Sequence, residues 1–501
     1  MDGADDGRYS PRGIAHRTIM GSPIRHIWFF NPPGALFQRG EDRCQANVEA
    51  SSAVSLRAPN DLAYMASVMR AAGIRCAITD FPAEGGTWDD FEKQFSALNP
   101  DLVVMSITNA TLRDDMEAFR RIKKNNPSVI TVAKGAWFWA GDLRGLSEPV
   151  FEAMDYALVG EAETEIKGLV EGLHAHTAPG DIPNIIFRLP DGTWKRTRIE
   201  AFETDLDAIP FPARDLLKND LYVRPDTGEA QATIQTARGC PSQCVFCLTP
   251  AISGARVRSR SPQNIVDELE ECVTRYGIRN FFFKADTFSI NKKFVIALCQ
   301  EILRRNLDIA WVANSRVDTV DEERLAWMKK AGCWLVAFGF ESGNDDVLKK
   351  MKKEATVEDA RRAAALVRQG GLKMYGFFMI GLPWDNDQTI RDTIALAREL
   401  ACDFYEIHLA TPFEGTELYT IAQSMGLLTT APLGHDYFAD PASGSLFLSR
   451  DQLIEYRKSG LRSLYLSPSY IYKTARSVNS PKVLLNYARY GVRLFRNLLK
   501  A

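Results

Sequence analysis

Apolar and polar positions alternate along the first part of the chain in a regular order of strands and helices. Apolar runs typical of strands span 24–31, 74–80, 102–108, 129–134 and 156–160. Between them, apolar residues recur at helical spacing over 61–72, 88–98, 114–124 and 163–173. Strands that alternate with helices predict a parallel sheet covered on both faces. We therefore expect residues 24–175 to form a doubly wound, Rossmann-like α/β domain, which would bind ligands beyond the strand carboxyl ends.

A second block repeats the pattern. Strand-like runs span 232–238, 278–286, 308–317, 334–342, 373–382 and 403–412, with helical patterns over 264–276, 322–330, 356–369 and 388–400. These strands are apolar and rich in β-formers, as expected of parallel strands covered on both faces. Six such repeats predict a partial, TIM-like (β/α)6 barrel over residues 231–426, with its chemistry at the strand carboxyl ends.

The remaining segments are predicted to be a tail (1–23), a linker (176–230) and a helical C-terminal segment (427–501). Within the linker, 189–193 has the composition of a hairpin turn. The C-terminal end is basic and amphipathic. Such a helix lies on an anionic bilayer, or it packs on the barrel with its charges in solvent, and the sequence leaves both open. Its apolar positions are Leu484, Ala488, Val492, Phe495 and Leu499, and its basic stripe is Arg489, Arg493, Arg496 and Lys500.

Composition narrows the class of protein. The chain has a net charge of −2, 46% hydrophobic residues and 25% charged residues. These values are ordinary for a soluble globular protein and argue against a nucleic-acid partner. The first residues are acidic with no apolar core, which argues against a secretory signal. The longest apolar run, Met374 to Leu382, is far shorter than the ~20 residues that a membrane span needs. We therefore expect a cytoplasmic protein.

The candidate chemistry centres on Cys240, Cys244 and Cys247, a C-x3-C-x2-C spacing just after the first strand of the second block. A [4Fe–4S] cluster usually takes four cysteine ligands, so three leave one iron open to a substrate or cofactor. The alternatives are buried core cysteines or half of a zinc site. A zinc site needs a fourth Cys or His at ligand spacing, and none lies nearby in the sequence. We therefore favour the iron–sulfur cluster.

Polar residues follow several strands of the second block, where a barrel interior would otherwise be apolar. They are Asp286, Arg316, Glu341 and Ser342, with Gly381 after the fifth strand. A structural ion pair between Arg316 and Glu341 is the alternative to ligand contact. His408, on the last strand, is more often a hydrogen-bonded core residue than a base.

With Phe246 before the third cysteine, residues 232–426 resemble the radical S-adenosyl-L-methionine (SAM) enzymes. The resemblance implies that the open iron binds SAM and that reduction of the cluster releases a 5′-deoxyadenosyl radical. It also implies an external electron donor of the flavodoxin or ferredoxin type. By position, the residues implied to contact SAM are Phe246, Asp286, Arg316, Glu341, Ser342 and Gly381.

Placed before such a barrel, the first block resembles the cobalamin-binding domain of the class B radical SAM enzymes. The residues implied to surround the nucleotide tail of cobalamin are Ser106, Thr108, Gly135, Gly160 and Glu161. The D-x-H-x-x-G motif is absent, so no histidine would bind cobalt from below. Where a pair of glycines is common in the family, the chain has Gly135 followed by Ala136. The aromatic run 137–139 would pack under the corrin ring or cover a domain interface.

Together these resemblances imply a cobalamin-dependent radical SAM enzyme. We expect a C-methyltransferase that acts on an unactivated carbon of a small molecule, which would be lipidic if the C-terminal helix lies on a membrane. The first alternative keeps both cofactors without methyl transfer, as in cyclisation or ring rearrangement of a tetrapyrrole or lipid. A remoter alternative is a non-catalytic iron–sulfur or cobalamin protein, against which the polar strand ends argue. Methylthiotransfer is disfavoured, because only Cys44 and Cys76 lie in the N-terminal half.

Overall fold

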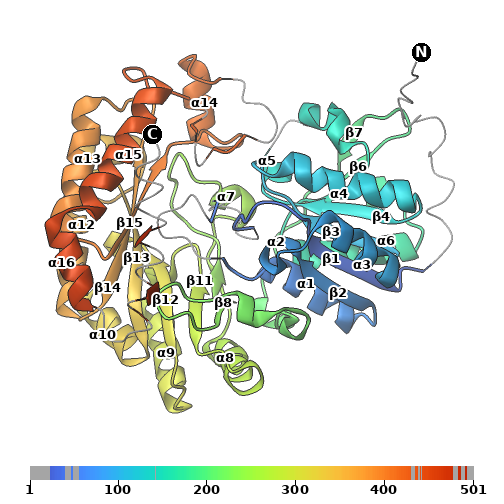
Figure 1. Cartoon of the computed structure of the whole chain (residues 1–501), viewed down its shortest axis with the longest axis horizontal. Coiled ribbons are helices and arrows are strands. Elements are labelled where there is room, and N and C mark those ends of the chain that lie inside the picture. Colours follow the sequence, from blue (N-terminus) through green and yellow to red (C-terminus); the bar gives the residue numbers. More distant parts are fainter. Residues whose placement is uncertain are drawn as a thin grey trace.

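The computed structural model describes residues 23–39, 47–48, 56–140, 143–429, 435–437, 440–441, 443–477, 483, 485–486 and 491–492. The chain forms two lobes side by side (Figure 1). One lobe holds the N-terminal sheet, in blue and cyan, and the other holds a half-barrel that runs from green to red. Both predicted α/β units are therefore present, in the predicted order.

The N-terminal sheet has seven strands in the order β2-β1-β3-β4-β5-β6-β7, and the first five are parallel. Helices from both sides cover it, which confirms the doubly wound arrangement. The parallel strands are β1 (His26–Asn31), β2 (Arg75–Asp80), β3 (Leu102–Ser106), β4 (Ile130–Lys134) and β5 (Tyr156–Leu158). The main helices are α1 (Asn60–Ala71), α3 (Trp88–Leu98), α4 (Leu112–Asn125) and α6 (Ala162–His174), and the short α2 (Phe81–Glu84) follows β2.

Strand β1 shows why the two faces of this sheet are both apolar. Successive side chains of a strand point to opposite faces. Ile27 and Phe29 pack into one core with α1 and α6, whereas Trp28 and Phe30 pack into the other with α3 and α4. A continuous apolar run, rather than an alternating one, is therefore what this central strand requires.

The segment predicted to be a linker contributes two further strands to the sheet. The strands β6 (Ile185–Arg188) and β7 (Trp194–Arg196) pair antiparallel beyond β5, and the predicted hairpin turn joins them. The prediction that 176–230 only joins the two blocks is therefore wrong for this part. Both strands are short and lie at the end of the sheet, so their patterns are too brief to distinguish them from a loop.

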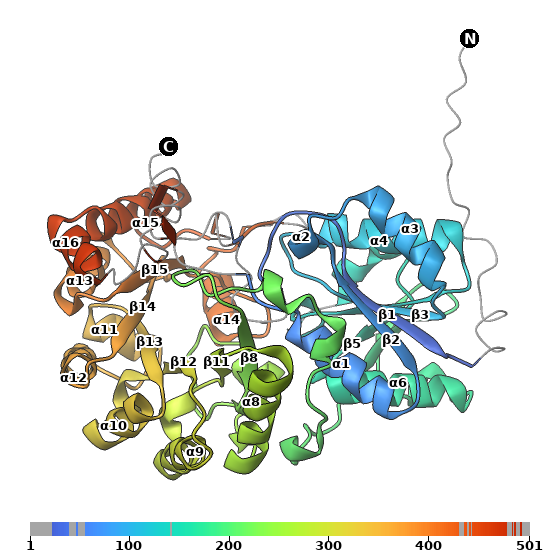
Figure 2. The same cartoon turned by 60° about the horizontal axis from the view of Figure 1, so that its bottom comes forward.

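The half-barrel has six parallel strands in the order β15-β14-β13-β12-β11-β8, so β8 and β15 lie at its two ends. The helices cover its outer face (Figure 2). This confirms the predicted partial barrel. Its strands are β8 (Gln231–Gln235), β11 (Asn280–Lys284), β12 (Ala310–Ser315), β13 (Cys333–Glu341), β14 (Lys373–Ile380) and β15 (Phe404–Leu409). Its helices are α8 (Pro262–Tyr276), α9 (Lys292–Arg304), α10 (Glu322–Lys330), α11 (Asp345–Lys350), α12 (Val357–Gln369), α13 (Asp387–Leu400) and α14 (Glu417–Ser424).

The C-terminal segment is helical, as predicted, and covers the edge strand β15. It consists of α15 (Arg450–Tyr465) and α16 (Pro468–Ser477). The Tyr465 hydroxyl donates to the carbonyl of Tyr405 at 2.7 Å and accepts from its N–H at 2.9 Å. Both backbone groups of an edge residue are thereby satisfied, which protects the edge from pairing with another chain.

The basic amphipathic end falls largely outside the described residues. Val492 is described and is 53% exposed. The other positions of that prediction, Leu484, Ala488, Phe495, Leu499, Arg489, Arg493, Arg496 and Lys500, lie outside the described part of the chain. Among the helices that the structure describes, none combines the length and apolar character needed to cross a bilayer.

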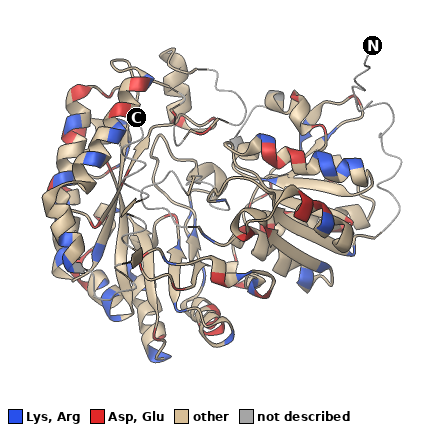
Figure 3. Cartoon of the chain, in the orientation of Figure 1, with Lys and Arg blue, Asp and Glu red and all other residues tan. Residues whose placement is uncertain are grey.

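Charges of both signs are distributed over both lobes (Figure 3). Basic and acidic residues alternate along the outer helices of the half-barrel and along those of the N-terminal domain. This mixture agrees with the net charge of −2.

Candidate functional site

The three cysteines share one loop, between β9 (Ala237–Arg238) and α7 (Thr249–Ile252), at the carboxyl end of β8. Cys240 is buried, and Cys244 and Cys247 are partly exposed. The Thr249 N–H donates to Cys247 Sγ at 3.4 Å, and Arg316 Nη1 donates toward Cys244 Sγ at 3.9 Å. Such donors stabilise the negative charge of a thiolate or of a cluster bound to it.

Gly239, directly before the first cysteine, permits the sharp entry into this loop. Its φ is +87°, and an added Cβ would lie 2.1 Å from the carbonyl oxygen of Arg256. Its N–H donates to a carboxylate oxygen of Asp286, the residue after β11 that the sequence analysis singled out. Asp286 therefore lies against the cysteine loop.

The pKa of the Cys244 thiol depends on its burial and on the basic residues beside the loop. Burial raises the pKa of Cys244 to about 11, although Lys353 and Arg316 act to lower it. The thiol must lose its proton to bind iron. Within the described ranges, no three Cys, His, Asp or Glu side chains are spaced to hold a single metal ion. A cubane needs a wider spacing, because each of its cysteines binds a different iron.

Arg316 and Glu341 each have a partner of their own, so they do not form the ion pair considered as an alternative. Arg316 pairs with Asp318 at 2.8 Å and donates to the hydroxyl of Ser242, in the cysteine loop, at 3.0 Å. Glu341 pairs with Lys353 at 2.7 Å. Arg316 also donates to the backbone carbonyl of Lys353 at 2.6 Å. The loop, β12 and β13 are thereby joined in one polar network.

Glu341 has a backbone conformation that is rare for its type. Its φ is +65°, and the register between β13 and β14 shifts at this point, between Gly339 and Glu341. Positive φ values at residues with side chains and bulges at strand ends concentrate at functional sites. At this bulge, which lies at the carboxyl end of β13, the Glu341 carboxylate points toward Lys353.

The other residues predicted to contact SAM occupy varied places at the same end of the half-barrel. Phe246 packs against the barrel core and is partly buried. The Ser342 hydroxyl lies 3.3 Å from that of Thr393 and accepts from the Asn344 N–H at 3.2 Å. The Gly381 N–H donates to Asp385 at 2.9 Å.

His408 faces the aromatic ring of Phe377, with ring centroids 5.8 Å apart. Burial lowers its pKa, so its imidazole is neutral near pH 7.

The residues predicted to surround cobalamin lie at the carboxyl ends of β3, β4 and β5. Arg39 donates to the Ser106 carbonyl at 3.1 Å. The Thr108 hydroxyl lies 2.8 Å from that of Thr111. At Gly135, φ is +156° and an added Cβ would lie 2.7 Å from the Ile107 carbonyl oxygen, so a side chain would close this approach between neighbouring loops.

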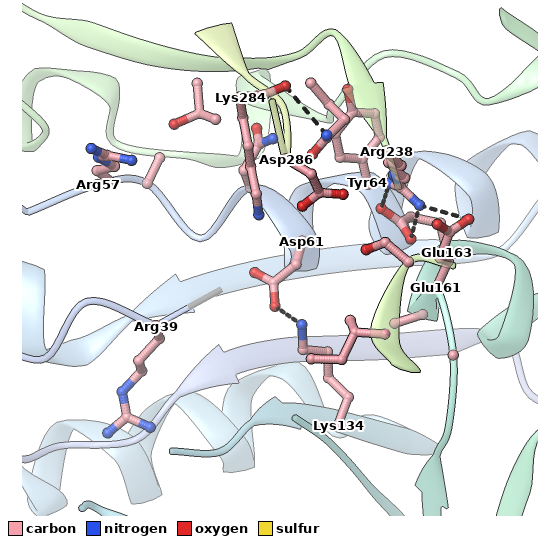
Figure 4. Close-up of a pocket in the computed structure, with 18 residues that line it drawn as sticks. Arg39, Arg57, Asp61, Tyr64, Lys134, Glu161, Glu163, Arg238, Lys284 and Asp286 are labelled. Carbon is pink, nitrogen blue, oxygen red and sulfur yellow. Dashed lines mark hydrogen bonds and ion pairs between the residues drawn. The ribbon is translucent and has the colours of Figure 1, made fainter. Parts of the chain in front are cut away.

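A cavity lies between the two lobes (Figure 4). On one side it is lined by residues of the N-terminal domain, among them Lys134 and Gly160, and on the other by Lys284 and Asp286 of the half-barrel. Lys134 pairs with Asp61 at 2.5 Å across its floor. The carboxyl ends of both sheets therefore face one space.

Comparisons with known proteins agree with both halves of this site. The radical SAM superfamily matches residues 234–397, and the B12 binding domain matches residues 52–170. An uncharacterized methyltransferase of Pyrococcus horikoshii is 30% identical over 416 residues, 83% of this chain and 89% of that protein. The chain belongs to the class B radical SAM enzymes.

Two further relatives extend the comparison. The anaerobic magnesium-protoporphyrin IX monomethyl ester cyclase of Rubrivivax gelatinosus is 26% identical over 420 residues, 82% of this chain and 74% of that protein. The radical S-adenosylmethionine methyltransferase TsrM from Kitasatospora setae, solved with cobalamin and a [4Fe–4S] cluster bound, matches with a TM-score of 0.68. At 16% identity over 95% of this chain and 100% of that chain, this match shows a shared fold.

The cofactors of this class B enzyme are a [4Fe–4S] cluster, SAM and cobalamin. The chemistry of the donor set fits. Three cysteines occupy one loop, and the nearby cations Arg316 and Lys353 suit an anionic cluster. Lys353 escaped the sequence analysis, because it stands in the run 349–353, which is rich in lysine and typical of a solvated surface. Lys353 can be buried because its ammonium group pairs with Glu341, a contact that the sequence does not reveal.

The aromatic run 137–139 of this radical SAM enzyme has partners within the protein. Phe138 is buried in the core, and Trp137 stacks on Phe151 with centroids 5.0 Å apart. Trp139 stacks on Phe202 at 5.8 Å. The helix α5 (Trp137–Ala140) contacts α7, directly after the cysteine loop. This placement fits the alternative in which the run covers a domain interface.

Glu165, next to the predicted cobalamin loop, gives a pH-dependent prediction. Burial raises its pKa to about 7, while its hydrogen bond from Asn184 acts to lower it. Because the folded pKa exceeds the unfolded value of 4.5, the stability contributed by Glu165 is lost as pH rises from about 4.5 to about 7. We expect Glu165→Gln to stabilise the protein at pH 8 and to change its stability little at pH 5, measured by urea unfolding. Glu171→Gln, on the exposed side of α6, is the control, and an equal effect of Glu165→Gln at both pH values would contradict the prediction.

Proposed function

We propose that this class B enzyme is a C-methyltransferase that acts on an unactivated carbon of a small molecule. The observation that carries the proposal is the cavity between the lobes, which is lined by Lys284 and Asp286 of the half-barrel and by Lys134 and Gly160 of the cobalamin-domain loops. When bound, the cluster and SAM supply a 5′-deoxyadenosyl radical and cobalamin carries the methyl group. A substrate held in that cavity would be within reach of both.

In this proposal Cys240, Cys244 and Cys247 hold the cluster. Arg316 donates to the cysteine loop through Ser242 and toward Cys244, so it orients the loop and offsets negative charge there. SAM would lie against the strand ends that carry Phe246, Asp286, Arg316, Glu341, Ser342 and Gly381.

On the cobalamin side, the proposed contacts are Ser106, Thr108, Gly135 and Gly160. Glu161, predicted for the same role, forms ion pairs with arginines of the half-barrel. We therefore assign its side chain to the contact between lobes, and its backbone remains beside Gly160.

Two relatives bear on methyl transfer against ring chemistry. The protein that is 30% identical is named a methyltransferase, and the protein that is 26% identical is named a cyclase. Both align over more than four-fifths of this chain, so both chemistries are compatible with its architecture. The higher identity favours methyl transfer, and ring formation without methyl transfer is the second candidate.

The partners follow from the chemistry. A radical SAM enzyme needs an external one-electron donor, for which we propose a flavodoxin or ferredoxin. Contact of the C-terminal end with a lipid surface stays a hypothesis, since most residues that would make it lie outside the described part of the chain.

The test is mass spectrometry of SAM products from protein reconstituted anaerobically with iron, sulfide, cobalamin and reductant. We expect 5′-deoxyadenosine together with S-adenosylhomocysteine, and neither from Cys244→Ala treated in parallel. Deoxyadenosine without S-adenosylhomocysteine would overturn methyl transfer in favour of ring chemistry. An intact cluster and bound cobalamin with neither product, across a panel of small-molecule acceptors, would count against the enzyme assignment.

A further inference from the structure

Two carboxylates at the start of α6 meet two guanidinium groups that flank the cysteine loop. Glu161 and Glu163 come from the N-terminal domain, and Arg238 and Arg258 come from the half-barrel. We call these four side chains the interlobe clamp. Figure 4 shows Arg238 directed at both carboxylates at one end of the cavity.

The clamp is close-packed and buried. Arg238 lies 2.5 Å from Glu163 and 3.1 Å from Glu161, and Arg258 lies 2.5 Å from Glu161. All four residues are buried, with side chains that are 5–10% exposed. Glu161 therefore bridges the two arginines, and Glu163 binds one of them.

The charges of the clamp balance. Burial alone would raise the pKa of Glu163, but the charge and hydrogen bond of Arg238, together with a backbone hydrogen bond and Lys134, hold that pKa below the usual range. The N-terminus of α6 adds positive potential beside both carboxylates. Two anions and two cations thus share one buried site, where removing one partner leaves an uncompensated charge.

The clamp connects the two cofactor sites over a very short path. On the half-barrel side, Arg238 and Arg258 face each other in the antiparallel pair of β9 and β10 (Arg258–Ser259), and Arg238 is two residues before Cys240. The loop is also fastened to the segment between α7 and β10, since the Cys240 N–H donates to the Gly254 carbonyl at 3.1 Å. On the other side, Glu161 directly follows Gly160.

We propose that Glu161 and Glu163, through Arg238 and Arg258, are positioning residues that fix the distance and orientation between the cysteine loop and the cobalamin loops. The proposal rests on the proposed function for its catalytic consequence. None of the four residues needs to touch a reacting atom. Their role is to hold two lobes, each with its own cofactor, in one geometry. A misplacement of about 1 Å costs on the order of 10²-fold in rate when reacting groups must meet in a defined arrangement.

The test compares Glu163→Gln with the wild type, both loaded with cluster and cobalamin. Glu163→Gln removes one charge of the clamp and keeps the size of the side chain. The first readout is the magnetic interaction between cob(II)alamin and the reduced cluster, measured by pulsed EPR. We expect one defined interaction in the wild type and a weaker, broader one in Glu163→Gln, with iron and cobalamin content unchanged.

The second readout separates positioning from general damage. Deoxyadenosine formation needs only the half-barrel, whereas S-adenosylhomocysteine formation needs both lobes in register. In Glu163→Gln we expect S-adenosylhomocysteine formation to fall by about 10²-fold, while deoxyadenosine formation and the KM for SAM stay within about twofold. A merely structural role would lower both products together with cofactor content.

A control variant on the same helix and a second substitution at Glu163 accompany this test. Glu171→Gln, on the exposed side of the same helix, should match the wild type in every readout. If Glu163→Gln does not fold, Glu163→Asp keeps the charge with a shorter side chain and should show the same broadening in milder form. An unchanged magnetic interaction in a fully loaded variant overturns the clamp. A wild type that binds both cofactors but makes no S-adenosylhomocysteine refutes methyl transfer instead, and the magnetic readout still judges the clamp.

Discussion

Replacing Glu268 with alanine is expected to lower the free energy of unfolding by about 3–5 kcal/mol. Glu268 lies on α8, and its side chain is fully buried between two arginines. Arg214 pairs with it at 2.6 Å, and Arg260 binds its other oxygen. Together these arginines keep the pKa of Glu268 low, against the effect of burial, which would raise it. The alanine variant would leave two buried guanidinium groups without their carboxylate.

The place of the buried triad of Glu268, Arg214 and Arg260 in the fold adds to the expected loss of stability. Arg214 comes from the segment between the lobes and donates to the Thr233 carbonyl at 3.0 Å, while Arg260 donates to the Gln235 carbonyl at 3.0 Å. Both carbonyls belong to β8, the strand that leads to the cysteine loop. Glu268 therefore fastens the connecting segment to the first strand of the half-barrel.

A surface pair on the same helix provides the control for Glu268→Ala. Glu271 pairs with Arg275 at 3.3 Å, with side chains 33% and 58% exposed. Exposed pairs at this spacing are worth about 0.3–0.5 kcal/mol, so Glu271→Ala should change stability little. Equilibrium urea unfolding of the two variants measures the difference. Similar midpoints for both would show that the buried triad contributes no more than a surface pair.

Much of the fold is predictable from the sequence, because its strands are apolar runs that helices bury, on both faces of the N-terminal sheet and on the outer face of the half-barrel. The second block has all six predicted strands and the four predicted helices, and the first block has its five parallel strands. The sequence does not predict that β6 and β7 extend the N-terminal sheet. They are only four and three residues long, and they join the sheet because β6 pairs with β5 and β7 pairs with β6.

In the candidate site, too, the features that are local in sequence are predictable, and the contacts between residues distant in sequence are not. The cysteine loop is visible in the sequence, because its three cysteines lie within eight residues. The arginines beside the loop, in contrast, pair with carboxylates that lie far away in the sequence. Arg238 meets Glu163 across 75 residues, and Arg258 meets Glu161 across 97. A charged residue whose partner lies so far along the chain looks like solvated surface until the fold is known. Sequence alone therefore places Glu161 with cobalamin and gives no role to Arg238, Arg258 or Glu163.

Replacing Gly239 with alanine is expected to remove most of the bound iron while leaving the rest of the chain folded. A positive φ costs an alanine about 1–2 kcal/mol. The added Cβ would also lie 2.1 Å from the Arg256 carbonyl oxygen, a backbone atom that side-chain rotation cannot move. The backbone at Cys240 must therefore shift. Since about 1.4 kcal/mol is a factor of ten in binding, we expect at least about a tenfold loss of cluster. Iron and sulfide per chain after anaerobic reconstitution measure it.

Gly277→Ala separates the effect of the clash from that of backbone strain. Gly277 ends α8 with φ +67°, and nothing lies within 4 Å of an added Cβ. This variant should lose about 1–2 kcal/mol of stability from its positive φ and bind the full complement of iron. If Gly239→Ala also binds full iron, the approach of Arg256 does not constrain the cysteine loop. If both variants lose iron equally, the loss reflects general destabilisation. Loss in Gly239→Ala alone means that the entry into the loop, and not only its three thiols, determines whether a cluster assembles.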